Sequence, residues 1–183
     1  MTAAITYNDN KFKELLLHIA ERSVDDERFG KTKLNKILFY IDFLAYKNFG
    51  EPLTGATYQR RPKGPVPKEI AAARSALFAS GEAMPVTRNY MGYPQERLFA
   101  KRPADTSLFD EQEMQVIDAV IEALWDKNAT SSSNLSHMEP GWRLASERED
   151  IPYASVFIGV REMTADDITR GQELWRELQP AVA

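Results

Sequence analysis

The segment 33–48 constrains the fold more than any other stretch of this sequence. Its apolar residues recur at the three- and four-residue spacing of an α-helix, and aromatic residues cover much of the remaining surface. A helix that is apolar on most sides is usually buried, so we expect this helix at the centre of a mainly α-helical domain. Thr32 is the expected N-cap and Gly50 the expected C-terminal glycine. The pattern consists of Leu34, Ile37, Leu38, Phe39, Tyr40, Ile41, Phe43 and Leu44.

Helical patterns recur along the rest of the chain. Pro67 suits the first position of one helix, because its missing N–H group would have no partner there. Asp110 and Glu113 have the spacing of a capping box, which marks the start of another helix. The predicted helical ranges are 8–23, 67–80, a stretch from residue 110 onward, two short pieces separated at Pro140, and 165–178.

Strand patterns occupy two short parts of the sequence. Residues 56–60 alternate between apolar and polar side chains, and residues 86–90 and 96–99 flank a turn at 91–94. The expected fold is therefore a compact helical bundle with a small β-hairpin or a three-stranded sheet. The sequence has no internal repeat or long linker, so we expect one domain over 1–183, with a core at about 8–160 and a C-terminal helix at about 165–178.

A rigid, basic loop is the best candidate for a binding surface. Residues 62–67 contain three prolines, which fix the backbone, and Arg60, Arg61 and Lys63 supply positive charge beside them. This cluster could be a solvated face, a docking site for an acidic partner, or a site for nucleic acid. Tyrosine and arginine are enriched in interface hot spots. The candidate partner-binding residues are therefore Tyr58, Arg60, Arg61, Lys63, Tyr90 and Tyr93, unless Tyr58 and one hairpin tyrosine instead pack in the core.

Composition limits the class of protein. The net charge is −4, whereas nucleic-acid-binding domains usually carry a basic excess. The chain has no cysteine, which excludes disulfides and thiolate metal sites and fits a reducing cytoplasm. No window is long and apolar enough to cross a membrane, and the N-terminus has no signal-peptide pattern. We therefore expect a cytoplasmic protein.

Motifs of catalysis and cofactor binding are incomplete. Gly30-Lys31-Thr32 ends like a phosphate-binding loop, but Asp25 stands where that motif needs its first glycine. His18 and His137 are the only histidines, and we expect structural roles for them, with His137 steadying the turn before Pro140. The sequence predicts no catalytic residue, no metal site and no cofactor. An enzyme site built from acidic residues is the remaining alternative, and it would reveal itself by a bound metal or ligand.

Three segments together resemble the Panacea domain, also known as the SocA-like antitoxin domain. Residues 33–43 (KLNKILFYIDF) are similar to the family pattern L-x-K-L-L-Y-Y-A-D-F, and residues 52–67 (PLTGATYQRRPKGPVP) to P-L-T-G-x-x-Y-x-A-x-x-x-G-P-V-P. Residues 135–142 (LSHMEPGW) are similar to L-S-H-x-x-x-x-W. The order and spacing match over about 8–160. Arg60 departs from the pattern, because relatives more often carry a small residue there.

The resemblance implies a compact, mainly α-helical domain that acts by binding a protein. Members are typically antitoxins of bacterial or phage toxin–antitoxin pairs, and the family is not known for catalysis. We therefore expect a non-enzymatic antitoxin that neutralises its cognate toxin by direct contact. A nucleic-acid-binding regulator that uses the basic residues near Arg60 is the alternative, and it would bind in a strongly salt-dependent manner.

Overall fold

Helices dominate the computed structural model, which describes residues 5–159 and 164–178. This confirms the predicted mainly α-helical class with a small β component. The α-helices are α1 (Asp9–Arg22), α2 (Lys31–Phe49), α3 (Ile70–Ala79), α4 (Glu111–Leu124), α5 (Ala129–His137), α6 (Pro140–Leu144) and α7 (Ala165–Leu178). The strands are β1 (Tyr58–Gln59), β2 (Val66–Pro67), β3 (Ala83–Tyr90) and β4 (Tyr93–Ala100), and two short 3-10 helices are η1 (Thr106–Leu108) and η2 (Tyr153–Phe157).

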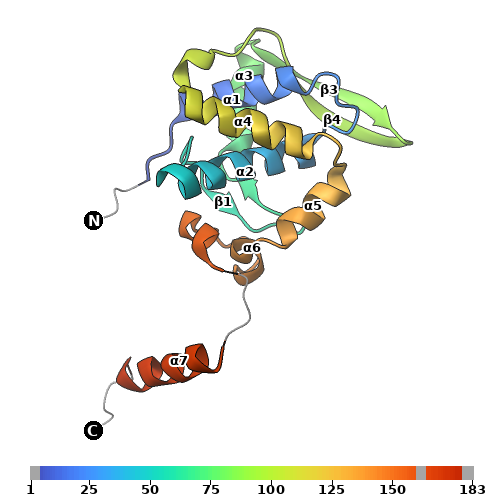
Figure 1. Cartoon of the computed structure of the whole chain (residues 1–183). Helices are drawn as coiled ribbons and strands as arrows, with labels where there is room; N and C mark the ends of the chain where they lie inside the picture. Colours follow the sequence, from blue (N-terminus) through green and yellow to red (C-terminus); the bar gives the residue numbers. More distant parts are fainter. Residues whose placement is uncertain (1–4, 160–163, 179–183) are drawn as a thin grey trace.

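Helix α2 lies at the centre of the bundle, as predicted (Figure 1). It packs against α4, α5, η2 and β2, and the side chains of Ile37 and Ile41 are fully buried. The predicted N-cap, Thr32, is wrong. Gly30 is the N-cap, because its carbonyl already accepts the first helical bond, from the amide of Leu34 at 2.9 Å. Gly50 ends the helix in the left-handed conformation, as predicted.

The strands form two separate antiparallel pairs. Tyr58 pairs with Pro67, and Gln59 with Val66, so the predicted strand at 56–60 does not join the hairpin, and the described residues contain no three-stranded sheet. The prediction that Pro67 opens a helix is wrong for the same reason. Its pairing with Tyr58 keeps the chain extended there, and α3 begins only at Ile70.

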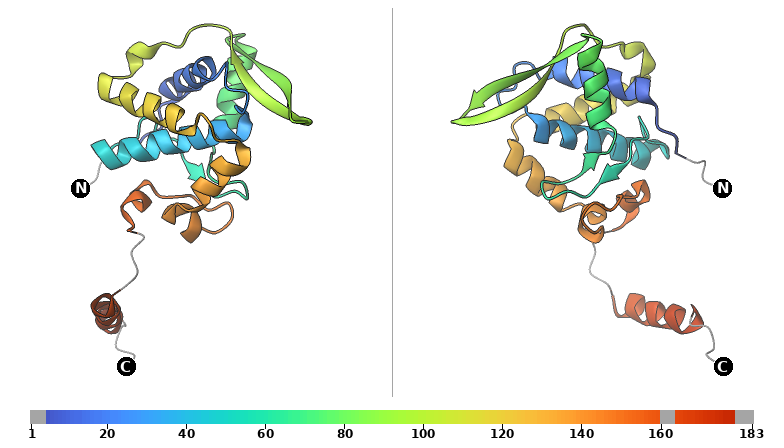
Figure 2. Two further views of the ribbon diagram at one scale, coloured as in Figure 1. Left: turned by 45° about the vertical axis from the view of Figure 1, so that its right-hand side comes forward. Right: turned by 180° about the vertical axis from the view of Figure 1, so that it is seen from behind.

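The β3–β4 hairpin is longer than predicted, with eight residues in each strand. Its turn is the two-residue loop Met91–Gly92, in which both residues have positive φ, 51° and 87°. That conformation matches the twist of the flanking strands. Figure 2 shows the hairpin projecting from the body of the bundle.

Two predicted helix boundaries are confirmed. Asp110 and Glu113 form both bonds of a capping box at the start of α4, and α5 and α6 meet at Pro140, the first residue of α6. The predicted C-terminal helix is present as α7, which Figure 1 shows apart from the bundle. Among the residues that the structure describes, no helix has the length and apolar character needed to cross a membrane.

Candidate partner-binding surface

Tyr58 is part of the core rather than of the surface. Its side chain is 1% exposed, and its hydroxyl donates to Oδ2 of Asp42 at 2.8 Å. The amide and hydroxyl of Thr54 also donate to this carboxylate, at 2.7 and 2.6 Å. Burial raises the pKa of Asp42 to about 6, against the opposite effect of these bonds. Tyr58 therefore cannot serve as a direct contact for a partner in this conformation, and the alternative that it packs the core is correct.

The backbone of the basic loop, residues 60–63, is held by distant parts of the chain. The carbonyl of Arg60 accepts a hydrogen bond from the amide of Arg148 at 2.9 Å, and its amide donates to the carbonyl of Glu149 at 2.9 Å. The carbonyl of Arg61 accepts from the indole Nε1 of Trp142 at 3.2 Å. The carbonyl of Lys63 accepts from the hydroxyl of Ser133 at 3.0 Å. These bonds use backbone groups of the loop, so they do not occupy the side chains of Arg61 and Lys63.

An aromatic stack joins the basic loop to α5 and α6. The ring of His137 stacks on Trp142 with the centroids 3.9 Å apart, and the guanidinium of Arg60 lies 4.4 Å from the Trp142 ring centroid. Burial, reinforced by the positive charges of Lys36 and Arg60, lowers the pKa of His137, while a hydrogen bond with the Pro62 backbone opposes that shift. His137 therefore has the structural role expected for it, next to the α5–α6 break.

A buried lysine lies beneath the loop. Lys36 is 1% exposed, and its ammonium donates to the carbonyl of Pro65 at 3.1 Å. Burial lowers the pKa of Lys36 to about 7. Gly64 has a φ of 97°, and a Cβ at this position would lie 2.6 Å from Cε of Lys36 and 2.3 Å from Oγ of Ser136. The loop therefore fits closely onto α2 and α5, and it needs glycine at this position.

Arg60, Arg61 and Lys63 have no acidic partner within 4.0 Å among the side chains that the structure describes. Two other cations of the domain are paired. Lys68 pairs with Asp150 at 2.7 Å, and Arg74 pairs with Glu96. The basic loop thus presents positive charge that the described part of the chain does not neutralise.

The hairpin tyrosines lie elsewhere. Tyr90 and Tyr93 face each other across the end of the hairpin, where Tyr93 is 76% exposed and Met91 81% exposed. Figure 1 places the hairpin at the top of the bundle and α6, beside the basic loop, at the bottom. The structure therefore separates the predicted site residues into two groups, Arg60, Arg61 and Lys63 in one and Tyr90 and Tyr93 in the other.

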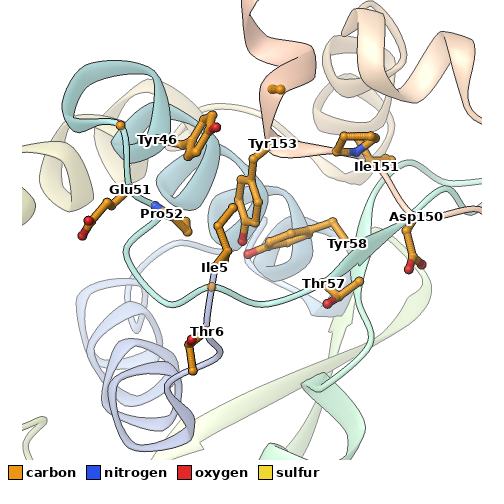
Figure 3. A pocket seen from close by; sticks show the side chains of 14 residues that line it. Ile5, Thr6, Tyr46, Glu51, Pro52, Thr57, Tyr58, Asp150, Ile151 and Tyr153 are labelled. Carbon is orange, nitrogen blue, oxygen red and sulfur yellow. The ribbon is translucent and has the colours of Figure 1, made fainter. Parts of the chain in front are cut away.

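A pocket of about 740 Å³ opens between the N-terminal segment, the end of α2 and η2 (Figure 3). Tyr46, Tyr58 and Tyr153 line it together with Pro52 and Ile5. The Tyr58 hydroxyl is used by Asp42, and the Tyr153 hydroxyl donates to the carbonyl of Ala56 at 2.6 Å. Tyr58 and Tyr153 therefore present their rings to the pocket rather than free hydroxyl groups.

Sequence reasoning missed Trp142 and Met138 as parts of the candidate surface. Trp142 fixes the loop through Arg61 and Arg60, and Met138, next to His137, is 66% exposed. Both residues lie in the 135–142 segment, whose sequence resembles the family pattern and could have pointed to them. What the sequence did not reveal is that this segment folds back onto residues 60–63.

Comparison with known families identifies the chain. Residues 34–143 match the model of the family described as antitoxin SocA-like, Panacea domain. The chain belongs to this family. The match begins in α2 and ends in α6, so it includes the basic loop and Trp142. No curated protein and no solved structure matches the chain.

The described part of this Panacea domain contains no group of three or more histidine, cysteine, aspartate or glutamate side chains able to hold a metal ion. Its buried ionisable groups serve the fold instead. Lys33, for example, donates to Asp26 at 2.5 Å and to the carbonyl of Trp125 at 2.7 Å. The side chains with chemistry to offer a partner are therefore those of the surface.

Proposed function

We propose that this protein is an antitoxin, which neutralises a cognate toxin by direct protein–protein binding and not by catalysis. The observation that carries the proposal is the match to the SocA-like Panacea antitoxin family over most of the bundle, residues 34–143. Stable protein–protein interfaces take roughly 800 Å² from each partner. A bundle of this size offers surfaces large enough for such an interface.

Arg60, Arg61 and Lys63 supply the features of a binding surface. A backbone that is already fixed loses little conformational entropy on binding, and the loop is fixed through Trp142, Ser133 and Arg148. The half-buried Tyr90 and the exposed Tyr93 form a second group at the other end of the bundle.

The experiment is growth of cells that express the gene adjacent to this one, with and without this protein. An Ile37→Asp variant, which places a charge in the core and should prevent folding, tests whether rescue requires the folded protein. We expect the neighbour alone to arrest growth, the wild-type protein to restore it, and the variant to fail. A harmless neighbour, or arrest that persists with the wild-type protein, would contradict the proposal.

The alternative, a nucleic-acid-binding regulator, is favoured by the unpaired charges of the basic loop. It predicts binding to a DNA or RNA duplex that weakens steeply as salt is raised. The net charge of −4 works against it, so it is the second candidate.

A further inference from the structure

Of the two groups of predicted site residues, the basic loop with its supporting side chains has the better-defined chemistry. We call Arg60, Arg61, Lys63, Met138 and Trp142 the basic surface. Resting on the proposed antitoxin function, we propose that the basic surface is where the toxin docks, and that it receives an acidic segment of the toxin that also carries an apolar side chain.

The charge of the loop favours an acidic partner. Lys68, a few residues along the chain, is neutralised by Asp150 at 2.7 Å, whereas Arg61 and Lys63 have no such partner among the described side chains. Two acids of the neighbouring segment are already engaged, since Asp150 holds Lys68 and the Glu149 carboxylate accepts from the amide of Ser146. The guanidinium of Arg61 and the ammonium of Lys63 are therefore left for a carboxylate from outside the chain, a pairing that gives strong, charge-assisted hydrogen bonds.

Arg60 is partly desolvated. Arg60 lies over the Trp142 ring, and its Nε is buried without a hydrogen-bond partner in the described structure. A buried donor without a partner lowers stability. A carboxylate brought in beside the stack would face a guanidinium already oriented by the aromatic ring.

The surroundings of the stack favour a protein over a nucleic acid. Met138 is 66% exposed beside the stack, which suits an apolar contact. Acidic side chains follow closely in the sequence, at Glu139, Glu147 and Glu149, and they would repel a continuous phosphate backbone. A protein segment can place its carboxylates at Arg61 and Lys63 alone, so an acidic protein segment fits better.

The test is charge reversal at two residues whose side chains make no contact that the fold requires. Arg61→Glu with Lys63→Glu leaves the loop carbonyls in place, and the melting temperature should stay within about 2 °C, as for other surface changes. The matched control is Lys101→Glu with Lys127→Glu, which makes the same change in net charge at two exposed lysines without ion pairs in the described residues.

The measurement is the dissociation constant of the purified complex with the neighbour's product, for each variant and at rising salt. We expect the loop variant to bind at least about tenfold more weakly, the control to bind within about twofold of the wild type, and only the loop variant to lose most of its salt dependence. A lysine substitution in an acidic segment of the toxin should then restore binding to the loop variant.

The outcomes separate the two proposals. If the wild-type protein restores growth and the loop variant binds and rescues as well as the wild type, the docking surface is wrong and the antitoxin function stands. If the loop variant loses affinity for a DNA or RNA duplex while its affinity for the toxin is unchanged, the surface belongs to nucleic acid and the proposal is overturned. Failure of the wild-type protein to restore growth overturns the function and this inference together.

Discussion

The two antiparallel strand pairs in the described part of the chain are held in place in different ways. The β1–β2 pair joins only two residues on each side, and its connecting loop is fixed by Arg148, Trp142 and Ser133. The β3–β4 pair joins eight residues on each side, and its turn is closed locally by a bond from the amide of Gly92 to the side chain of Asn89 at 2.9 Å. The shape of the basic loop therefore depends on distant packing, and that of the hairpin turn on its own ladder.

The largest expected effect comes from the helix that supports the basic loop. Ile37→Ala should lower the free energy of unfolding by about 2–5 kcal/mol, because it removes a fully buried side chain and leaves a cavity. Met91→Ala at the exposed hairpin turn should change it by less than about 0.5 kcal/mol. Denaturant unfolding of both variants measures the difference. A loss below about 0.5 kcal/mol for Ile37→Ala would mean that α2 is not central.

Two glycines with similar backbone angles allow a sharper comparison. Both Gly64 and Gly92 have positive φ, 97° and 87°, so alanine is strained at either position. Only at Gly64 would the new Cβ also collide with Ser136 and Lys36, since nothing lies within 4 Å at Gly92. We expect Gly92→Ala to cost about 1–2 kcal/mol and Gly64→Ala to cost about 1–3 kcal/mol more.

Thermal or denaturant unfolding checks the glycine pair. If both variants lose the same free energy of unfolding, the basic loop accommodates a Cβ as easily as the hairpin turn does. The loop would then not be fixed by distant packing more tightly than the turn.

The pH dependence of stability gives the most specific effect. The pKa of Lys36 is about 7 in the folded state, below its ordinary value of 10.5. Between these values the folded protein holds fewer protons than the unfolded chain, so this lysine makes the free energy of unfolding rise with pH. The slope is at most about 1.4 kcal/mol per pH unit.

Replacing the lysine isolates its contribution. Lys36→Met keeps the length of the side chain and removes the charge, so the rise in stability between about pH 7 and pH 9 should be reduced relative to the wild type. Urea unfolding at several pH values measures it. Lys101→Met, at an exposed site, should leave the pH profile unchanged, and an unchanged profile for Lys36→Met would place this ammonium in contact with water.

The helices could be predicted from the sequence because their signals are local. Ile37 and Ile41 share the spacing of one helical face, and Asp110 and Glu113 lie within one helical turn. The pairing of Tyr58 was harder. Its strand pairs with residues 66–67 rather than with the hairpin. The alternation of apolar and polar residues in a two-residue strand is too short to predict which segment it pairs with.

The candidate surface was predicted in part. The charge of Arg60, Arg61 and Lys63 is visible in the sequence, and the structure places them on one loop. The contacts of Trp142 with residues 60 and 61 cross some eighty positions of the chain, and no short motif encodes such a contact. The sequence left open whether Tyr58 lies at the surface or in the core, because the buried carboxylate that binds its hydroxyl, Asp42, belongs to another element.

The hydrogen bonds to the carbonyl groups of the basic loop also affect how the sequence of such a domain can evolve. The carbonyl groups of Arg61 and Lys63 hold the loop, and carbonyl groups are the same in every amino acid. A mutation at either position therefore alters what the loop displays without altering where the loop lies. We expect recognition here to diverge by single substitutions, with each new version inheriting the same scaffold.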